Sequence, residues 1–234
     1  MATASTPTVR DLADKLIERL RPSGWADVLL PFLASVQFEE IITKLQREVA
    51  VGNRFTPPLK KVFRPFEDCP YSKLHTVFVG TEPYFTPEVA DGLLLSTPNG
   101  GRKPAALVKF QREIAATVYK CEREFQNDLG YIASQGVLLL NAALTTKIGE
   151  QAGHYSIWRP FMNYLFFDVL SRNTDILFIY LGQAGHEYSD MLTGEHIQLF
   201  MEHPAQAPRE GWESHDIFGR INRLLLEKGD IIVW

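Results

Sequence analysis

The sequence predicts an α/β fold in three layers, with a central four-stranded parallel sheet between two layers of helices. Three observations support this prediction. Four short β-rich runs occur in order, and the segments between them contain amphipathic helical stretches. The runs are nearly continuous in apolar residues, which is typical of parallel strands buried on both faces. The predicted strands are Leu74 to Val79, Val137 to Leu140, Ile176 to Leu181 and Ile197 to Met201.

The region before the first strand is predicted to be mainly helical. Apolar residues recur at three- and four-residue steps within residues 9–50, and Pro22 and Gly24 separate two helices there. Residues 1–8 are expected to be disordered, with Thr8 and Asp11 three residues apart as in a capping box. Residues 53–71 are rich in proline and predict an irregular connection. The stretches Ala105 to Phe125 and Trp158 to Leu170 predict the helices between strands.

Composition narrows the class of protein. The 234 residues are 45% hydrophobic and 22% charged, as in an ordinary globular protein, and no repeat or linker divides them, so residues 1–234 are expected to form a single domain. Cys69 and Cys121 do not form a CxxC pair, which argues against a disulfide framework or a zinc site and favours a reducing, cytoplasmic setting. The longest nearly apolar run, Val137 to Leu144, is too short to span a membrane. The N-terminus lacks the apolar core of a signal peptide.

Polar or glycine-rich residues follow each predicted strand. Glu82 lies in the segment after the first strand, Asn141 follows the second, Gly182 and Gln183 follow the third, and His203 follows the fourth. In open α/β sheets, ligands bind outside the carboxyl ends of the strands. A carboxylate, an amide and an imidazole are therefore expected to converge at one edge of the sheet.

Several common sites are excluded by their missing motifs. No GxGxxG dinucleotide fingerprint, P-loop, nucleophile elbow or HExxH metal motif is present. No cofactor and no metal are expected.

The loop sequences resemble the family 1 uracil-DNA glycosylases. The family motif GQDPYHGPGQAHGL-x-FS compares with GTEPYFTPEVADGLLLS from Gly80, and its GVLLLN strand compares with GVLLLNAALTTKIGEQAGH from Gly136. LGQAGHEY from Leu181 resembles the family's third loop, and HPAQAP from His203 corresponds to its HPSPLS loop. The four motifs occur in the family's order, and the resemblance runs from about Trp25 to the C-terminus.

The resemblance implies a monofunctional DNA glycosylase. Such an enzyme hydrolyses the N-glycosidic bond of a flipped uracil or modified pyrimidine and leaves an abasic site. Glu82 would orient water and stabilise the sugar cation, and His203 would hydrogen-bond the leaving base. Asn141 would read the edge of the pyrimidine, and Tyr84 would exclude a methyl group at C5.

Four pocket positions depart from the family pattern. Glu82 is one methylene longer than the family's aspartate, and Thr81 replaces a glutamine. Phe85 replaces a histidine, and Leu95 replaces the phenylalanine that stacks on uracil. Base–aromatic stacking is worth about 1–3 kcal/mol, so Leu95 is expected to weaken the holding of uracil or to admit a bulkier base.

The DNA contacts implied by the resemblance are also altered. The expected DNA-binding residues are Lys103, Pro104, Gly182, Gln183, Pro204, Ala205 and Arg209. The leucine that fills the gap left by the flipped base is missing from the fourth loop, and Arg209 or Trp212 is a candidate replacement. DNA is the expected partner of a monomeric protein, in base excision repair or in defence against phage DNA that carries modified bases.

A second hypothesis from another class stays open. The chain could be a catalytically weak or inactive module, related to the glycosylases, that binds DNA or another protein in viral replication or defence. The net charge of −4 hides a local asymmetry that bears on DNA binding. Basic residues gather at Arg54, Lys60, Lys61 and Arg64 and again from Arg102 to Arg123, whereas residues 182–216 are acidic. Weak or salt-sensitive binding to plain duplex DNA is expected, because phosphate contacts dominate affinity.

Overall fold

A four-stranded parallel sheet forms the centre of the computed structural model, which describes residues 8–208, 212 and 215–234. The strand order is β3-β2-β5-β6, and all three neighbouring pairs are parallel. The strands are β2 (Thr76–Gly80), β3 (Val137–Asn141), β5 (Leu177–Leu181) and β6 (Ile197–Met201). The four predicted strands are confirmed, with boundaries shifted by at most two residues.

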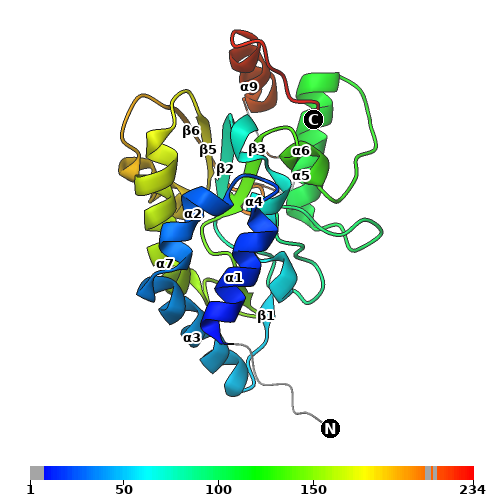
Figure 1. Cartoon of the computed structure of the whole chain (residues 1–234). Helices are drawn as coiled ribbons and strands as arrows, with labels where there is room; N and C mark the ends of the chain where they lie inside the picture. The colour runs from blue at the N-terminus through cyan, green and yellow to red at the C-terminus, as the bar shows by residue number, and fades with distance from the viewer. Residues whose placement is uncertain (1–7, 209–211, 213–214) are drawn as a thin grey trace.

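Helices cover both faces of the sheet, as Figure 1 shows. Val77 and Val79 point to one face and pack in one core, whereas Phe78 points to the other and packs in a second core. The first face is covered by α1 (Val9–Leu20), α2 (Ala26–Leu33), α3 (Val36–Ala50), α4 (Arg64–Asp68) and α7 (Tyr155–Tyr164). The second is covered by α5 (Ala105–Ile114), α6 (Gly130–Ala133) and α9 (Ile217–Leu226). The predicted three-layer α/β/α architecture is confirmed.

The N-terminal helices begin where the capping pattern predicts. The Thr8 side chain accepts a hydrogen bond from the Asp11 N–H at 3.1 Å, and the Asp11 carboxylate accepts from the Thr8 N–H at 2.8 Å. The first seven residues, part of the segment expected to be disordered, lie outside the described residues. Three helices, not two, occupy residues 9–50, because α2 forms between Trp25 and Ala34 despite its internal Pro31.

The predicted helix over 105–125 ends early. α5 continues through a π-helical turn, η3 (Ala115–Tyr119), and stops at Lys120, whose φ of 55° is left-handed. The predicted helix over 158–170 starts earlier, as α7, and continues through η4 (Leu165–Val169) and η5 (Leu170–Arg172). The other short elements are β1 (Phe55–Thr56), η1 (Leu59–Lys61), η2 (Tyr71–Lys73), β4 (Thr146–Lys147), α8 (Gln183–His186) and η6 (Ser189–Met191). Of these, β1 and β4 pair as a small antiparallel sheet.

Arg64 is buried, so it does not belong to the group of basic residues that was expected to favour DNA. Its guanidinium forms ion pairs with Asp68 at 2.8 Å, Asp91 at 2.7 Å and Asp128 at 2.5 Å. Only 8% of the Arg64 side chain is exposed. Because Arg64 is buried and paired with three carboxylates, its guanidinium is not available to bind a phosphate.

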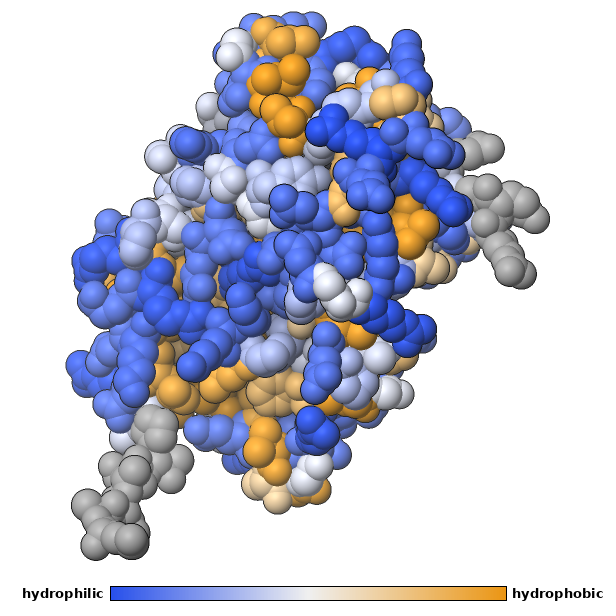
Figure 2. All heavy atoms as spheres, turned by 90° about the vertical axis from the view of Figure 1, so that its right-hand side faces the viewer, coloured by the Kyte–Doolittle hydropathy of each residue, from blue (hydrophilic) through white to orange (hydrophobic). Residues whose placement is uncertain are grey.

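The surface shown in Figure 2 is largely hydrophilic, with apolar side chains gathered near its upper and lower ends. Within the part of the chain that the structure describes, none of the helices has the length and apolarity needed to cross a membrane. Both cysteines are free thiols, Cys69 buried and Cys121 exposed.

Candidate active site

A cavity of about 300 Å³ lies at the carboxyl edge of the sheet. It brings together residues from the loops after β2, β3 and β6, which are far apart in the sequence. Eight of the predicted site residues line it: Thr81, Glu82, Tyr84, Phe85, Leu95, Asn141, His203 and Ala205. The convergence expected from the strand order is therefore present in the structure.

Glu82 is held through one of its two carboxylate oxygens. Oε2 accepts a hydrogen bond from the Thr146 hydroxyl at 2.7 Å and another from the Ala152 N–H at 2.7 Å. The loop that carries Glu82 is itself tied to the loop after β3, since the Ala143 N–H donates to the Thr81 carbonyl at 3.0 Å. The carboxylate is thus fixed at the cavity wall by groups of a neighbouring loop.

Asn141 ends strand β3 and is 2% exposed. Its Oδ1 is buried and has no hydrogen-bond partner among the described residues. A buried amide oxygen without a partner costs free energy, and this one belongs to a residue that lines the cavity. An unsatisfied acceptor in such a place is suited to a ligand that brings its own N–H donor.

His203 follows β6 and is kept neutral by its surroundings. Burial lowers the pKa of its imidazole to about 4. The Ala205 N–H donates to Nδ1 at 3.1 Å. Because a neutral imidazole carries one proton, accepting at Nδ1 assigns that proton to Nε2 and makes Nε2–H a donor.

Tyr84 and Leu95 form an ordered part of the cavity wall. The Tyr84 hydroxyl donates to the Leu95 carbonyl at 2.9 Å, and burial raises the pKa of this phenol. Leu95 has a left-handed φ of 61°, which is uncommon for a branched apolar residue. Phe85 lies at the rim with 37% of its surface exposed, and its carbonyl accepts from the Gly149 N–H at 2.9 Å.

Three predicted DNA-binding residues lie beside the cavity without lining it. Gly182 has a φ of 75°, and a side-chain carbon built on it would come within 3.1 Å of the His203 Cβ. Glycine at this position thus permits the close approach of the third and fourth loops. Gln183 begins α8 and is exposed, whereas Pro204 is buried.

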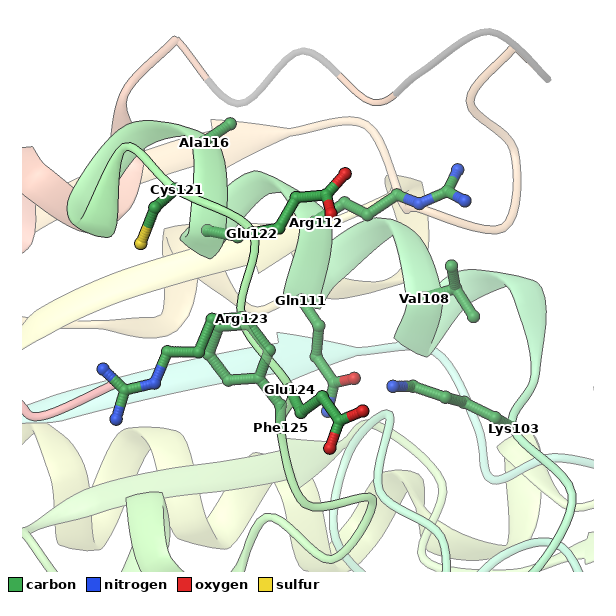
Figure 3. A pocket seen from close by; sticks show the side chains of 11 residues that line it. Lys103, Val108, Gln111, Arg112, Ala116, Cys121, Glu122, Arg123, Glu124 and Phe125 are labelled. Atoms are coloured by element: carbon green, nitrogen blue, oxygen red, sulfur yellow. The ribbon is translucent and has the colours of Figure 1, made fainter.

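The remaining predicted DNA-binding residues lie elsewhere. Lys103 is exposed and, with Pro104, precedes α5. It lines a separate hollow of about 670 Å³, shown in Figure 3, where acidic Glu122 and Glu124 offset the basic side chains. Arg209 lies outside the described residues.

Trp212 does not replace the missing leucine wedge. It is 3% exposed and stacks on Phe110 with ring centroids 6.2 Å apart, and its indole N–H donates to the Glu202 carbonyl at 2.9 Å. A side chain packed in this way belongs to the core and cannot enter a DNA duplex.

Sequence patterns missed several residues that shape the site. Lys109 on α5 donates to the Pro204 carbonyl at 3.1 Å and to the Ala207 carbonyl at 2.7 Å, and so fixes the loop that carries His203. Gln151, Ala152 and Gln206 line the cavity. None of these residue types signals a site by itself. Their position within the quoted loop motifs was the available signal for the three that line the cavity.

No family model matches the chain. The similar curated proteins nevertheless share one name, uracil-DNA glycosylase. The uracil-DNA glycosylase of Campylobacter fetus is 29% identical over 221 residues, which cover 94% of this chain and 93% of the relative. The uracil-DNA glycosylase of Proteus mirabilis is 27% identical over 211 residues, with 89% and 93% covered.

Solved structures show the same fold. The crystal structure of mimivirus uracil-DNA glycosylase superposes with a TM-score of 0.80 at 22% identity and covers 93% of this chain and 88% of that chain. The UNG structure from Nitratifractor salsuginis gives a TM-score of 0.58 at 19% identity, with 86% and 90% covered. The chain is thus similar in sequence to uracil-DNA glycosylases, at 27–29% identity over most of its length, and it has the fold of these solved structures.

Proposed function

We propose that the protein is a monofunctional DNA glycosylase that hydrolyses the N-glycosidic bond of a flipped uracil or modified pyrimidine in DNA and leaves an abasic site. The observation that carries this proposal is the convergence of Glu82, Asn141 and His203 on one cavity of about 300 Å³. A cavity of this size is at the lower end of the range for small-ligand sites and suits a single base. The names of the relatives support uracil as the base.

His203 acts on the leaving base in this proposal. Cleavage of the glycosidic bond leaves negative charge on the pyrimidine, and a fixed donor stabilises that charge as it develops. A neutral imidazole with its proton on Nε2 is such a donor. The lowered pKa and the Ala205 N–H at Nδ1 both support this protonation state.

Asn141 recognises the base. The N3–H of uracil is a donor, and the buried Oδ1 of Asn141 is an acceptor without a partner among the described residues. Pairing the two satisfies both groups. A cytosine offers an acceptor at N3 in place of that donor, so the same amide oxygen would disfavour it.

Glu82 acts on the sugar and on water. Its Oε2 is occupied by two hydrogen bonds, so Oε1 is the oxygen proposed to orient the attacking water. The negative charge of the carboxylate stabilises the cationic sugar that forms as the bond breaks.

The wall of the cavity bears on which base is accepted. Leu95 offers no aromatic ring for stacking, and Tyr84 is held by its hydrogen bond to the Leu95 carbonyl. The fixed Tyr84 ring is proposed to exclude a methyl group at C5. Uracil is therefore the preferred substrate in this proposal. Pyrimidines modified at positions other than C5 are the second choice. The proposed setting is the cytoplasm.

Incubation with single-stranded oligonucleotides tests the proposal. One set carries a single uracil, one carries modified pyrimidines, and a thymine oligonucleotide of the same sequence serves as control. We expect alkali-labile abasic sites in the uracil strand and none in the control. Binding without cleavage of any strand would refute the glycosylase and favour the non-catalytic module. The comparisons with known proteins do not support that module better than they support the glycosylase.

A further inference from the structure

The Thr146 hydroxyl is the feature of the site that neither the motifs nor the chemistry above assigns. Thr146 lies in β4, is fully buried, and does not line the cavity. Its Oγ1 nevertheless lies 2.7 Å from Glu82 Oε2, across 64 positions of sequence. The hydroxyl therefore contacts the carboxylate from behind the cavity wall.

The two acceptors near this hydroxyl differ in distance. Thr146 Oγ1 lies 2.7 Å from the Glu82 carboxylate and 3.2 Å from the Glu150 carbonyl. A threonine hydroxyl has a single proton to donate, and hydrogen bonds to an ionised acceptor are the shorter and stronger ones. The proton is therefore directed mainly to Glu82.

The backbone holds both donors in place before any substrate arrives. Thr146 pairs with Thr56 in the small sheet of β1 and β4. Ala152 has a left-handed φ of 56°, and this turn directs its N–H to the same Glu82 oxygen at 2.7 Å. The Gly149 N–H donates to the Phe85 carbonyl and ties this turn to the loop that carries Glu82.

The Thr146 hydroxyl and the Ala152 N–H together form a cradle for the carboxylate, and their positions fit a glutamate. An aspartate at position 82 would end one carbon–carbon bond, about 1.5 Å, short. Such a retreat would lengthen the two 2.7 Å contacts at this oxygen and weaken both hydrogen bonds. The extra methylene of Glu82 is thus matched by donors placed at its end.

We propose that Thr146 is a positioning residue for catalysis: its hydroxyl, with the Ala152 N–H, fixes one oxygen of Glu82 and thereby aims the other at water. The inference rests on the proposed glycosylase function. A displacement of about 1 Å in a positioned group can cost about 100-fold in rate. Loss of the hydroxyl is therefore expected to slow bond cleavage while DNA binding stays unchanged.

The test measures single-turnover excision of uracil and, separately, binding of the uracil oligonucleotide. Thr146→Val removes the hydroxyl and keeps the shape. We expect it to cleave about 10- to 100-fold more slowly, with a dissociation constant within threefold of the wild type. Thr146→Ser keeps the hydroxyl and is expected to retain most of the rate.

Thr56→Val is the matched control. Thr56 lies directly opposite Thr146, is 3% exposed, and its Oγ1 has no hydrogen-bond partner among the described residues. The same chemical change there is expected to leave the rate within twofold. Equal losses in the two valine variants would show that packing of the small sheet, and not the hydroxyl, matters.

A double-mutant cycle with Glu82→Asp makes the assignment specific. The shorter carboxylate is expected to lose most of its contact with these two donors, so Thr146→Val should add little further loss in that background. Losses that multiply fully would overturn the proposal, as would a wild-type rate in Thr146→Val. If Thr146→Val fails to fold by its thermal transition, Thr146→Ala and Thr146→Ser replace it in the same cycle. A wild-type protein that releases no uracil would refute the proposed function itself, which is a separate outcome.

Discussion

Replacing Arg64 by methionine tests how the wall of the cavity is supported. The Arg64 guanidinium pairs with three carboxylates, of Asp68, Asp91 and Asp128. Asp91 in turn accepts from the Ser96 hydroxyl at 2.7 Å and from the Leu93 N–H at 3.2 Å, just before Leu95 in the wall. Methionine keeps much of the volume and removes the charge, leaving buried carboxylates without their cation.

The expected loss at pH 7.5 is large. Removing one partner of a buried ion pair typically costs about 3–5 kcal/mol. For a chain of this size, 1 kcal/mol shifts the melting temperature by about 2–4 °C, so a decrease of about 10 °C is expected. Arg112 is exposed, and Arg112→Met is expected to change the free energy of unfolding by less than about 0.5 kcal/mol.

The sign of the pH dependence follows from Asp91. Burial raises the pKa of this carboxyl, and the charge of Arg64 opposes that rise. Without Arg64 the pKa rises further, so the folded variant binds a proton that the unfolded chain releases. The stability deficit relative to wild type should therefore shrink as the pH falls from 7.5 to 5.5, by at most about 1.4 kcal/mol per pH unit.

Urea unfolding of wild type and of both variants, at pH 7.5 and at pH 5.5, measures these differences. A deficit below about 1 kcal/mol in Arg64→Met would refute the reasoning that the network stabilises the fold. A deficit that stays constant or grows at pH 5.5 would refute the assignment of the uncompensated charge to Asp91.

Further predictions concern the cavity directly. Asn141→Ala and His203→Ala should each lower single-turnover excision by about 100-fold or more, the cost of losing one fixed donor or acceptor; wild-type rates in folded variants would contradict the assigned roles. The His203 imidazole should titrate in NMR with a midpoint near 4, staying neutral above it; a midpoint near 6.5 would contradict its burial. Leu95→Phe should tighten binding of a uracil oligonucleotide about fivefold or more, since stacking is worth about 1–3 kcal/mol; unchanged or weaker binding would show that no base lies against this wall.

The sheet was predictable because its strands consist almost wholly of apolar residues. β2, β3 and β5 are buried along their whole length, whereas the edge strand β6 leaves Ile197 and Phe200 exposed, so its burial on both faces was not confirmed. The pairing of β1 with β4 was not predicted, because each strand has two residues and carries no periodicity. α2 was missed because Pro31 interrupts the pattern that would indicate a helix. The helix predicted to reach Phe125 stops at Lys120, where a left-handed backbone ends the ladder.

Some residues of the candidate site were likewise predictable from the sequence, and others were not. Glu82, Asn141 and His203 were predictable because each lies at or just after the carboxyl end of a strand, and parallel strands bring these ends to one edge. Thr146 and Lys109 were not, because a buried hydroxyl or an ordinary lysine gains its meaning only from a partner distant in sequence. The burial of Arg64 was hidden for the same reason: Asp91 and Asp128 lie 27 and 64 positions away.

Release of free uracil by the wild type and by Glu82→Gln, measured beside DNA binding, tests the central claim most directly. Glutamine keeps the length of the side chain and removes the negative charge. We expect the wild type to release uracil and leave an alkali-labile site, and Glu82→Gln to bind the same strand with little release. Equal release by the two proteins, or binding by the wild type without any release, would contradict the assignment of this cavity to base excision.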